Sequence, residues 1–309
     1  MSRFIAKIGG FVLVMSLLFT SGAWLNASLL SFHLPPESPE TTTLLLGDSH
    51  AQNALDPDYL ENSLSLAKGA EPLFATHAKL VFASDRFPSL DHVVLAVGSH
   101  SLAPFRGEID SSPRADDILA SYVGFLGWQQ FLAWRRADGW DVSWEQVLSS
   151  ELRRWFTPNR HLLHDWWAHR GESYGWDHPY VGGFSTTSQS LLTEDALLER
   201  IEHHYGRSGV SPVQAMFLDS IAAWAGERGA DLLLVATPVH DRYRARVPTE
   251  VSEFFTKTMS RVSEIDNVSF IDLRDLPLPD AQFRDYDHLN SAGAVHVSQA
   301  VRDFIFKQE

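Results

Sequence analysis

Two short motifs far apart in the sequence hold the residue types that nucleophilic acyl transfer requires. Residues 47–49 (Gly-Asp-Ser) end an apolar run near the beginning of the chain, and residues 285–288 (Asp-Tyr-Asp-His) lie near its end. Together they supply a hydroxyl, an imidazole and carboxylates. In such chemistry Ser49 attacks an acyl carbon, His288 accepts the serine proton, and Asp285 holds the imidazole in the tautomer that can accept it.

Each motif also has an ordinary structural interpretation. A serine after a strand often caps a helix, so Ser49 could be an N-cap, and Asp285 and Asp287 could be solvated turn residues beside His288. The expected location favours chemistry, because ligands of an open parallel sheet bind at the carboxyl ends of the strands and both motifs follow predicted strands. Asp287 is also close to His288 in the sequence and is the second candidate for the orienting acid.

The elements that must position these groups alternate between apolar strands and amphipathic helices. Short runs of consecutive apolar residues predict buried strands, because a parallel sheet covered on both faces leaves no polar face along its strands. The pattern predicts an α/β fold with a mostly parallel sheet. The predicted strands are 43–46, 64–67, 93–97, 231–236 and 268–273, and the predicted helices are 71–82, 211–228, 250–265 and 291–306, the last capped by Ser291.

The region at about 105–205 differs from the rest, because it holds eight of the ten tryptophans and has no long β-branched runs. We expect it to be a mainly helical insertion into the α/β domain, and it could form a cap over the active site. Tryptophans at helical spacing are usually core residues. Tyr174, Trp176 and Tyr180 lie in a stretch with Gly and Pro and are better candidates for stacking against sugar rings.

The first thirty residues predict export of the chain that follows. Arg3 and Lys7 precede an apolar stretch over 8–25, which is just long enough to span a bilayer as a helix. The positive charges should stay in the cytoplasm. A cleaved signal peptide is the alternative, and both interpretations place the following domain in the periplasm or outside the cell. The expected organisation is a signal-anchor or transmembrane helix over 1–30, a proline-containing linker over 31–42 and one α/β domain over 43–309.

Charge and composition exclude several classes of function. The 309 residues carry a net charge of −14, which argues against nucleic acid as a partner, because phosphate binding needs clustered Lys and Arg. The chain has no cysteine, which excludes disulfides, thiolate metal sites and a cysteine nucleophile. Its 14 histidines include the cluster His161, His164 and His169, but no spacing typical of a metal site. We therefore expect neither a metal nor another cofactor.

The two motifs resemble those of the SGNH (GDSL-type) serine hydrolase superfamily. The likeness rests on the Gly-Asp-Ser motif and on the Asp-x-x-His motif, which Leu-Asn-Ser-Ala-Gly follows. It implies a flavodoxin-like three-layer sandwich, over roughly 42–104 and 207–306. It also implies that Ser49 is the nucleophile, His288 the base and Asp285 the orienting acid.

By the same resemblance, donors at three positions would stabilise the developing oxyanion. The first two are the backbone amides of Ser49 and of Gly69, which follows the second predicted strand. The third motif of the family is usually Gly-x-Asn. Here it is Gly-Ser-His, so His100 takes the asparagine position, and His100 or Ser99 could donate in its place. The other polar residues expected to line the cleft are Asp48, Ser99, His240, Tyr243 and Asp287.

The expected architecture is similar to that of cell-envelope members that acylate or deacylate surface polysaccharides, such as the alginate O-acetylation and teichoic acid D-alanylation proteins. The first hypothesis is a membrane-anchored esterase or O-acyltransferase that acts on acyl esters, with polysaccharide as the substrate and envelope proteins as further partners. The second is a non-catalytic protein of the same fold that binds polysaccharide or a partner acyltransferase. The third is a cleaved, freely secreted hydrolase.

Overall fold

The computed structural model describes residues 2–33, 38–104 and 183–307. Residues 105–182 of the predicted insertion lie outside the described residues, and so do the candidates within it: Tyr174, Trp176, Tyr180 and the cluster His161, His164 and His169. The described chain contains a five-stranded sheet with the order β2-β1-β3-β4-β5, and all neighbouring strands are parallel. This is the order of flavodoxin-like folds, and it confirms the predicted α/β class. The strands are β1 (Thr43–Gly47), β2 (Ser63–Ser65), β3 (His92–Ala96), β4 (Asp231–Ala236) and β5 (Val268–Asp272).

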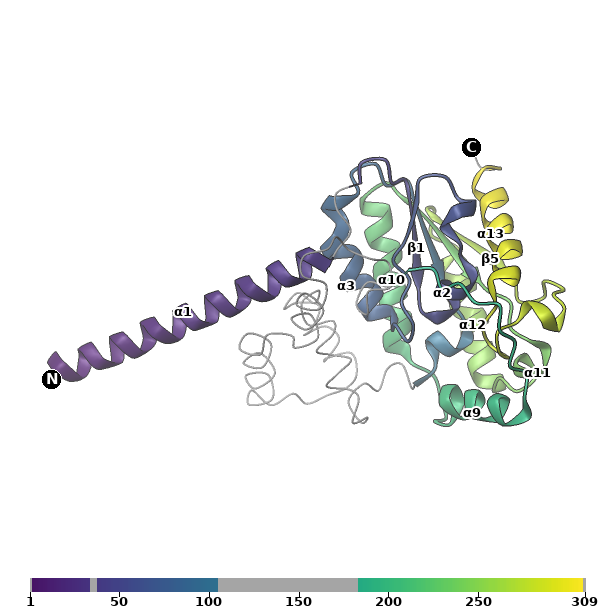
Figure 1. Cartoon of the computed structure of the whole chain (residues 1–309), viewed down its shortest axis with the longest axis horizontal. Coiled ribbons are helices and arrows are strands. Elements are labelled where there is room, and N and C mark those ends of the chain that lie inside the picture. Colours follow the sequence, from purple (N-terminus) through teal and green to yellow (C-terminus); the bar gives the residue numbers. More distant parts are fainter. Residues whose placement is uncertain (1, 34–37, 105–182, 308–309) are drawn as a thin grey trace.

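Helices cover both faces of the sheet and complete three layers (Figure 1). On β1, Leu44 and Leu46 belong to the core cluster that contains α3, α10 and α12, whereas Leu45 belongs to the cluster that contains α2 and α13. Successive side chains of a strand point to opposite faces, so consecutive leucines fill both interfaces at once. The helices of the body are α2 (Ser49–Ala54), α3 (Leu73–Ala83), α9 (Glu194–Tyr205), α10 (Pro212–Glu227), α11 (Asp241–Arg244), α12 (Thr249–Val262) and α13 (Ser291–Ile305), with short 3-10 turns at Pro57–Tyr59, Ser84–Arg86, Ser99–Leu102 and Asp280–Gln282.

The start of α13 differs from the sequence prediction. Ser291 was expected to cap this helix, and that prediction is wrong. The side chain of Asn290 caps it by accepting hydrogen bonds from the N–H groups of Ala292 and Gly293. Asparagine and serine are both strong N-caps, so the sequence alone did not choose between neighbours. The hydroxyl of Ser291 donates instead to the carbonyl oxygen of Thr187.

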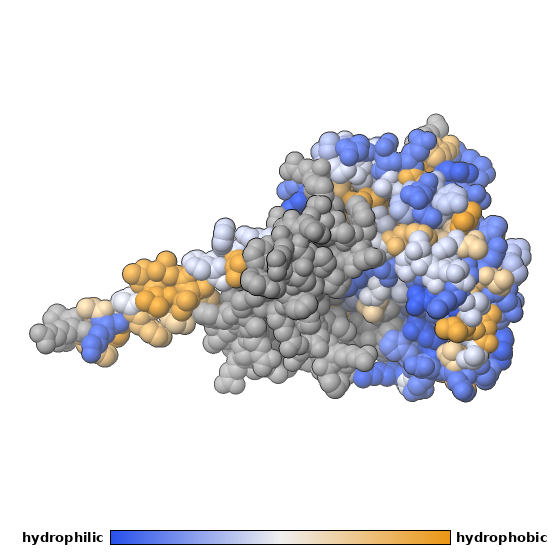
Figure 2. Space-filling view, viewed as in Figure 1, coloured by the Kyte–Doolittle hydropathy of each residue, from blue (hydrophilic) through white to orange (hydrophobic). Residues whose placement is uncertain are grey.

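The first helix, α1 (Ser2–His33), projects away from the α/β body (Figure 1). Its segment Phe4–Leu25 has a mean hydropathy of 1.9 and is long and apolar enough to cross a membrane, a test that a signal sequence near the N-terminus also passes. Figure 2 shows apolar residues along this helix. The helix runs past residue 30, the predicted end of the anchor, and Leu29 is buried in the core cluster of α3 and α10. Leu25, the last residue of the apolar segment, is half-buried and packs against the same cluster, so the helix contacts the body from the end of that segment onward.

The strand order reverses at the centre of the sheet, between β1 and β3. β1 leads to β2 on one side, whereas β3 leads to β4 on the other, and the carboxyl ends of β1 and β3 border the crevice in which such proteins bind ligands. Gly47, the last residue of β1, has a φ of 125°, and a Cβ there would lie 2.6 Å from the carbonyl oxygen of Ala96 in β3. Glycine permits this close approach in this conformation. Asp48 and Ser49 follow it directly at the crevice.

Candidate active site

The structure brings Ser49, His288 and Asp285 into one hydrogen-bonded line. The Nε2 of His288 lies 2.7 Å from the Oγ of Ser49, and its Nδ1 lies 2.9 and 3.0 Å from the two carboxylate oxygens of Asp285. An ionised carboxylate only accepts hydrogen bonds, so Nδ1 carries the proton and Nε2 can accept one from the serine hydroxyl. This is the order of donors and acceptors that a serine nucleophile needs.

Asp48 rather than Ser49 caps α2. The Oδ1 of Asp48 accepts a hydrogen bond of 2.9 Å from the N–H of His50, and Ser49 is the first residue of the helix. The hydroxyl of the half-buried Ser49 is therefore not used as a cap and is left to His288. The backbone N–H of Ser49 precedes the helical ladder, which starts with the bond from the N–H of Gln52 to the carbonyl oxygen of Asp48.

The loop that carries His288 is shaped by Asp285. The Oδ1 of Asp285 accepts hydrogen bonds from the backbone N–H groups of Asp287, at 3.1 Å, and His288, at 2.9 Å. An antiparallel bridge between Phe283 and Leu289 closes the loop. The carboxylate that orients the imidazole therefore also fixes the backbone from which the imidazole extends.

Asp287, the second candidate for the acid, is engaged by an arginine. Arg200 donates to both of its carboxylate oxygens, at 2.8 and 3.0 Å from Nε and at 2.5 Å from Nη2. The Oδ1 of Asp287 lies 3.6 Å from the Nδ1 of His288, which is too far for a hydrogen bond. Burial alone would raise the pKa of Asp287, but the electrostatic influence of His288 and the contacts with His50 and Arg200 hold that pKa well below its ordinary value. Asp285 is thus the carboxylate within hydrogen-bonding distance of the His288 ring.

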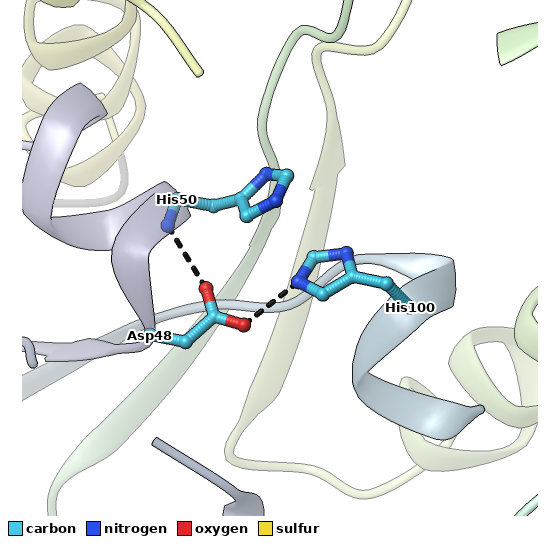
Figure 3. A group of neighbouring side chains, drawn as sticks. All are labelled: Asp48, His50 and His100. Carbon is cyan, nitrogen blue, oxygen red and sulfur yellow. Dashed lines mark hydrogen bonds and ion pairs between the residues drawn. The ribbon is translucent and has the colours of Figure 1, made fainter. Parts of the chain in front are cut away.

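His100, expected at the oxyanion hole, lies in a buried stack of histidines. Its Nε2 donates to the Oδ2 of Asp48 at 2.7 Å, and the residue is 2% exposed (Figure 3). Its ring stacks on that of His50 with the centroids 3.9 Å apart, and on that of His204 at 5.0 Å. The Nε2 proton of His100 is therefore bonded to Asp48 and is not offered to an oxyanion.

Gly69, the second expected amide donor, lies beside Ser49. A Cβ added at Gly69 would come 3.9 Å from the Cβ of Ser49. The turn is strained at the next position, because Ala70 has a φ of 62°, a conformation that costs a residue with a Cβ roughly 1–2 kcal/mol. Lys68 precedes the glycine, and burial lowers the pKa of its ammonium group to about 8. The backbone of both predicted amide donors is thus adjacent to the nucleophile.

A buried ion pair supports the turn that carries Gly69. The Nζ of Lys79 lies 2.6 Å from the Oε2 of Glu71 and donates at 2.5 Å to the carbonyl oxygen of Leu66, while the hydroxyl of Thr76 donates to Glu71 at 2.8 Å. The Lys79 and Glu71 side chains are both fully buried. Burial raises the pKa of Glu71 and lowers the pKa of Lys79, and their mutual attraction opposes both shifts. Lys79 in α3 thereby joins the two ends of the turn.

The other residues predicted to line the cleft lie in different surroundings. Tyr243 is fully buried, and its hydroxyl lies 2.5 Å from the Nδ1 of His204 and donates to the hydroxyl of Tyr205 at 3.3 Å. Burial raises the pKa of Tyr243 well above 10. Ser99 hydrogen-bonds to Tyr205, and His240 caps α11. Tyr243 and Ser99 therefore belong to a polar layer joined to Asp287 through His204, not to the immediate surroundings of Ser49.

Two residues of α9 that no sequence motif indicates, Arg200 and His204, contribute to the site. They are four positions apart and so lie on one face of the helix. Arg200 pairs with Asp287, and the Nε2 of His204 lies 3.9 Å from the same carboxylate. The Nε2 of His204 accepts from Arg200 at 3.2 Å, because a guanidinium only donates. The spacing of four could have indicated a shared face, but not the carboxylate that this face meets.

The backbone groups of the segment that enters α9 form hydrogen bonds with four parts of the site, one of them from the N–H of Leu191 to the carbonyl oxygen of Arg284 in the loop of His288. Residues 183–193 have no regular secondary structure, yet they lie along the ends of β2, α2 and α13. The other contacts run from the N–H of Gly183 to Ala67, from the N–H of Ser185 to Gln52, and between Thr187 and Ser291 in both directions. This segment therefore forms one border of the site.

Two groups of buried side chains have atoms close enough together for a metal ion, namely Asp48, His50 and His100, and His50, Asp287 and His288. Their carboxylates are already engaged, because Asp48 accepts a hydrogen bond from His100 and Arg200 forms an ion pair with Asp287. The Nε2 of His50 has no hydrogen-bond partner among the described residues and faces the Oδ2 of Asp287 at 3.5 Å. A metal would have to displace an arginine or break the bond between Asp48 and His100, so the residues present do not fit one.

No family model matches this sequence, and no curated protein sequence matches it. Among solved structures, the chain is similar to the crystal structure of a "putative acylhydrolase" from Bacteroides fragilis. The sequence identity is 10%, the TM-score is 0.41, and the likeness covers 91% of this chain and 94% of that one. At this TM-score the likeness carries no functional assignment, which therefore depends on the geometry of the site.

Proposed function

We propose that this protein is a serine esterase or O-acyltransferase of the SGNH type, with Ser49 as nucleophile, His288 as base and Asp285 as orienting acid. The observation that carries the proposal is the distance of 2.7 Å between the Nε2 of His288 and the Oγ of Ser49, with Asp285 on the opposite ring nitrogen. A cap or a turn residue would not need this alignment of three groups from the two ends of the described body.

The reaction follows from the donors and acceptors at the site. Ser49 gives its proton to the Nε2 of His288 while its Oγ bonds to the carbonyl carbon of an ester. The carbonyl oxygen becomes an oxyanion, for which the backbone N–H groups of Ser49 and Gly69 are the proposed donors. The bond to the alcohol then breaks, the alcohol leaves with the proton from His288, and the acyl group stays on Ser49. Water or a sugar hydroxyl then gives its proton to His288 and bonds to the acyl carbon. The bond between that carbon and the Oγ of Ser49 breaks, and Oγ takes the proton back from His288.

The proposed setting is the membrane surface on the periplasmic or outer side of the cell. The support is the exposed apolar segment Phe4–Leu25, with Arg3 and Lys7 near its beginning. The proposed substrates are acyl esters of surface polysaccharide, and envelope proteins are proposed as partners. Cleavage of the segment would release the same enzyme as a secreted hydrolase.

Labelling with a fluorophosphonate probe tests the proposal, because the probe reacts with a serine that a neighbouring base has activated. The full chain in detergent micelles should be labelled, and peptide mapping should place the adduct on Ser49. The variant Ser49→Ala should lose both labelling and hydrolysis of p-nitrophenyl acetate at an unchanged unfolding temperature. Ser188→Ala is the matched control, since Ser188 is exposed in the bordering segment 183–193. Folded wild-type protein that the probe does not label would contradict the proposal.

A second candidate is a non-catalytic protein that binds polysaccharide or a partner acyltransferase. The observation that favours it is the bond from His100 to Asp48, which leaves the third oxyanion position without the donor expected there. This candidate predicts glycan binding that persists in Ser49→Ala together with no labelling of the wild type. The triad proposal predicts labelling of the wild type, so one experiment separates the two.

A further inference from the structure

Two carboxylates lie near the same ring nitrogen of His288. The oxygens of Asp285 lie 2.9 and 3.0 Å from Nδ1, and the Oδ1 of Asp287 lies 3.6 Å from it. A rotation of the imidazole or a small shift of the loop would exchange one partner for the other. Asp287 differs from Asp285 in its contact with Arg200, which donates hydrogen bonds to both of its carboxylate oxygens.

We propose that Arg200 is a positioning residue. By holding the carboxylate of Asp287 away from the Nδ1 of His288, it keeps this nitrogen hydrogen-bonded to Asp285. The inference rests on the proposed function, because it assigns Arg200 a role in keeping the base aligned with Ser49. Arg200 acts through Asp287 and touches neither the nucleophile nor the base in the described contacts. The guanidinium suits this role, because it is always charged and its flat fork can hold two carboxylate oxygens at once.

The orientation of Arg200 is itself fixed by α9. The Nη2 of Arg200 also donates to the Nε2 of His204, whose Nδ1 lies 2.5 Å from the hydroxyl of the buried Tyr243. His204 and Tyr243 are nearly fully buried, whereas 28% of the Arg200 side chain is exposed. The arginine is therefore held by rigid neighbours but can be substituted without opening a cavity in the core.

The charged and titratable groups that face His288 determine the sign of the effect. From its own loop these are Asp285 and Asp287, with the Nε of Arg284 3.9 Å from Asp285, and from α2 the ring of His50 lies 5.0 Å from the ring of His288. From α9, Arg200 cancels the charge of Asp287 and His204 faces the same carboxylate. Loss of the arginine leaves an unpaired carboxylate beside His288 and favours the imidazolium, which cannot accept the serine proton.

Two substitutions should therefore shift the protonation of His288 in opposite directions. Arg200→Met should raise the pH at which His288 loses its proton by about one unit, because an opposite charge at this distance shifts a pKa by roughly that much. Asp287→Asn should lower it, because the arginine charge is then unpaired. The double variant should lie between the two single variants. Arg246→Met is the matched control, since Arg246 also forms an ion pair with α9, through Glu194, and should leave the titration unchanged.

The titration is measured on the full chain in detergent micelles by NMR of ¹³C-labelled histidine, with the His288 signal identified by its loss in His288→Gln. The pH dependence of fluorophosphonate labelling provides the second readout, and its acid limb should move with the NMR value. If the pH at which His288 loses its proton is unchanged or lower in Arg200→Met, the inference is overturned. If Arg200→Met does not fold, an unchanged or higher pH for Asp287→Asn overturns it instead. The NMR value is independent of turnover, so an unlabelled wild type with the expected shifts would refute the proposed function alone.

Discussion

Removal of Lys79 should separate the stability of the fold from the alignment of the turn that carries Gly69, the proposed oxyanion donor. The ammonium group pairs with Glu71 at 2.6 Å with no exposure of either side chain. Breaking a buried pair on one side costs about 3–5 kcal/mol, because the other charge stays buried and uncompensated. For a body of 150–250 residues each kcal/mol lowers the unfolding temperature by about 2–4 °C, so Lys79→Met should lower it by about 6–20 °C.

The double variant Glu71→Met/Lys79→Met distinguishes the two roles of the pair. Replacement of both charges by apolar side chains of similar size is often neutral or stabilising, so the unfolding temperature should recover most of its loss. The rate at which the probe labels Ser49 should be low in both Lys79→Met and the double variant. In both, Lys79 no longer donates to the carbonyl oxygen of Leu66, so the turn at Gly69 loses its support. Lys257→Met, at an exposed position of α12, is the control for loss of a lysine charge.

The pH dependence of Lys79→Met supplies an independent check. Burial already raises the pKa of Glu71 in the intact pair, and loss of the ammonium group should raise it further. A carboxyl whose pKa is higher in the folded than in the unfolded state destabilises the fold above the folded pKa and ceases to do so as the pH falls below it. The deficit measured by thermal unfolding should therefore shrink towards low pH. A deficit of less than about 3 °C, or one that grows on acidification, would refute the reasoning.

Three further substitutions test other parts of the structure. Asp285→Asn should lower kcat for p-nitrophenyl acetate about a thousandfold or more, because the wrong imidazole tautomer is then favoured; activity within tenfold of wild type would contradict the assignment of the acid. Gly47→Ala should lower the unfolding temperature, since the Cβ would lie 2.6 Å from the Ala96 carbonyl oxygen at a φ of 125°; an unchanged temperature would show that β1 and β3 can separate there. The lowered pKa of Lys68, about 8 against 10.5, means that the unfolded chain binds more protons between these values, so stability should rise with pH over this range and rise less in Lys68→Met. Equal slopes in thermal unfolding from pH 8 to 10.5 would argue against a buried ammonium group.

The architecture could be predicted because the strands of a covered parallel sheet are apolar at every position. β4 occupies Asp231–Ala236 as expected, and the other strand and helix boundaries lie within three residues of the predicted ones. The N-cap residues were harder to predict from the sequence. Asp48 rather than Ser49 caps α2, and Asn290 rather than Ser291 caps α13. Adjacent polar residues have similar capping propensities, and the choice depends on contacts that each residue makes elsewhere, such as the one between Ser291 and Thr187.

The candidate site was only partly accessible from the sequence. The meeting of Ser49 with His288 followed from the rule that parallel strands share one functional edge. The sequence also favoured Asp285 over Asp287 as the orienting acid, but it did not indicate the arginine that engages Asp287, because Arg200 comes from a helix 87 positions before it. The burial of His100 against Asp48 was equally hidden, since it depends on how two loops at neighbouring strand ends pack together. Pairings between side chains of distant segments leave no local pattern.

The separation of 239 positions between Ser49 and His288 has a consequence for how activity arises during biosynthesis. Closing a loop of that length costs on the order of 5 kcal/mol of chain entropy, so the contact cannot form ahead of the sheet that carries it. A nascent polypeptide would carry a serine without its base and would not react with esters. Reactivity of Ser49 would then report that the last strand and helix have docked, which makes the probe adduct a marker of completed folding in the living cell.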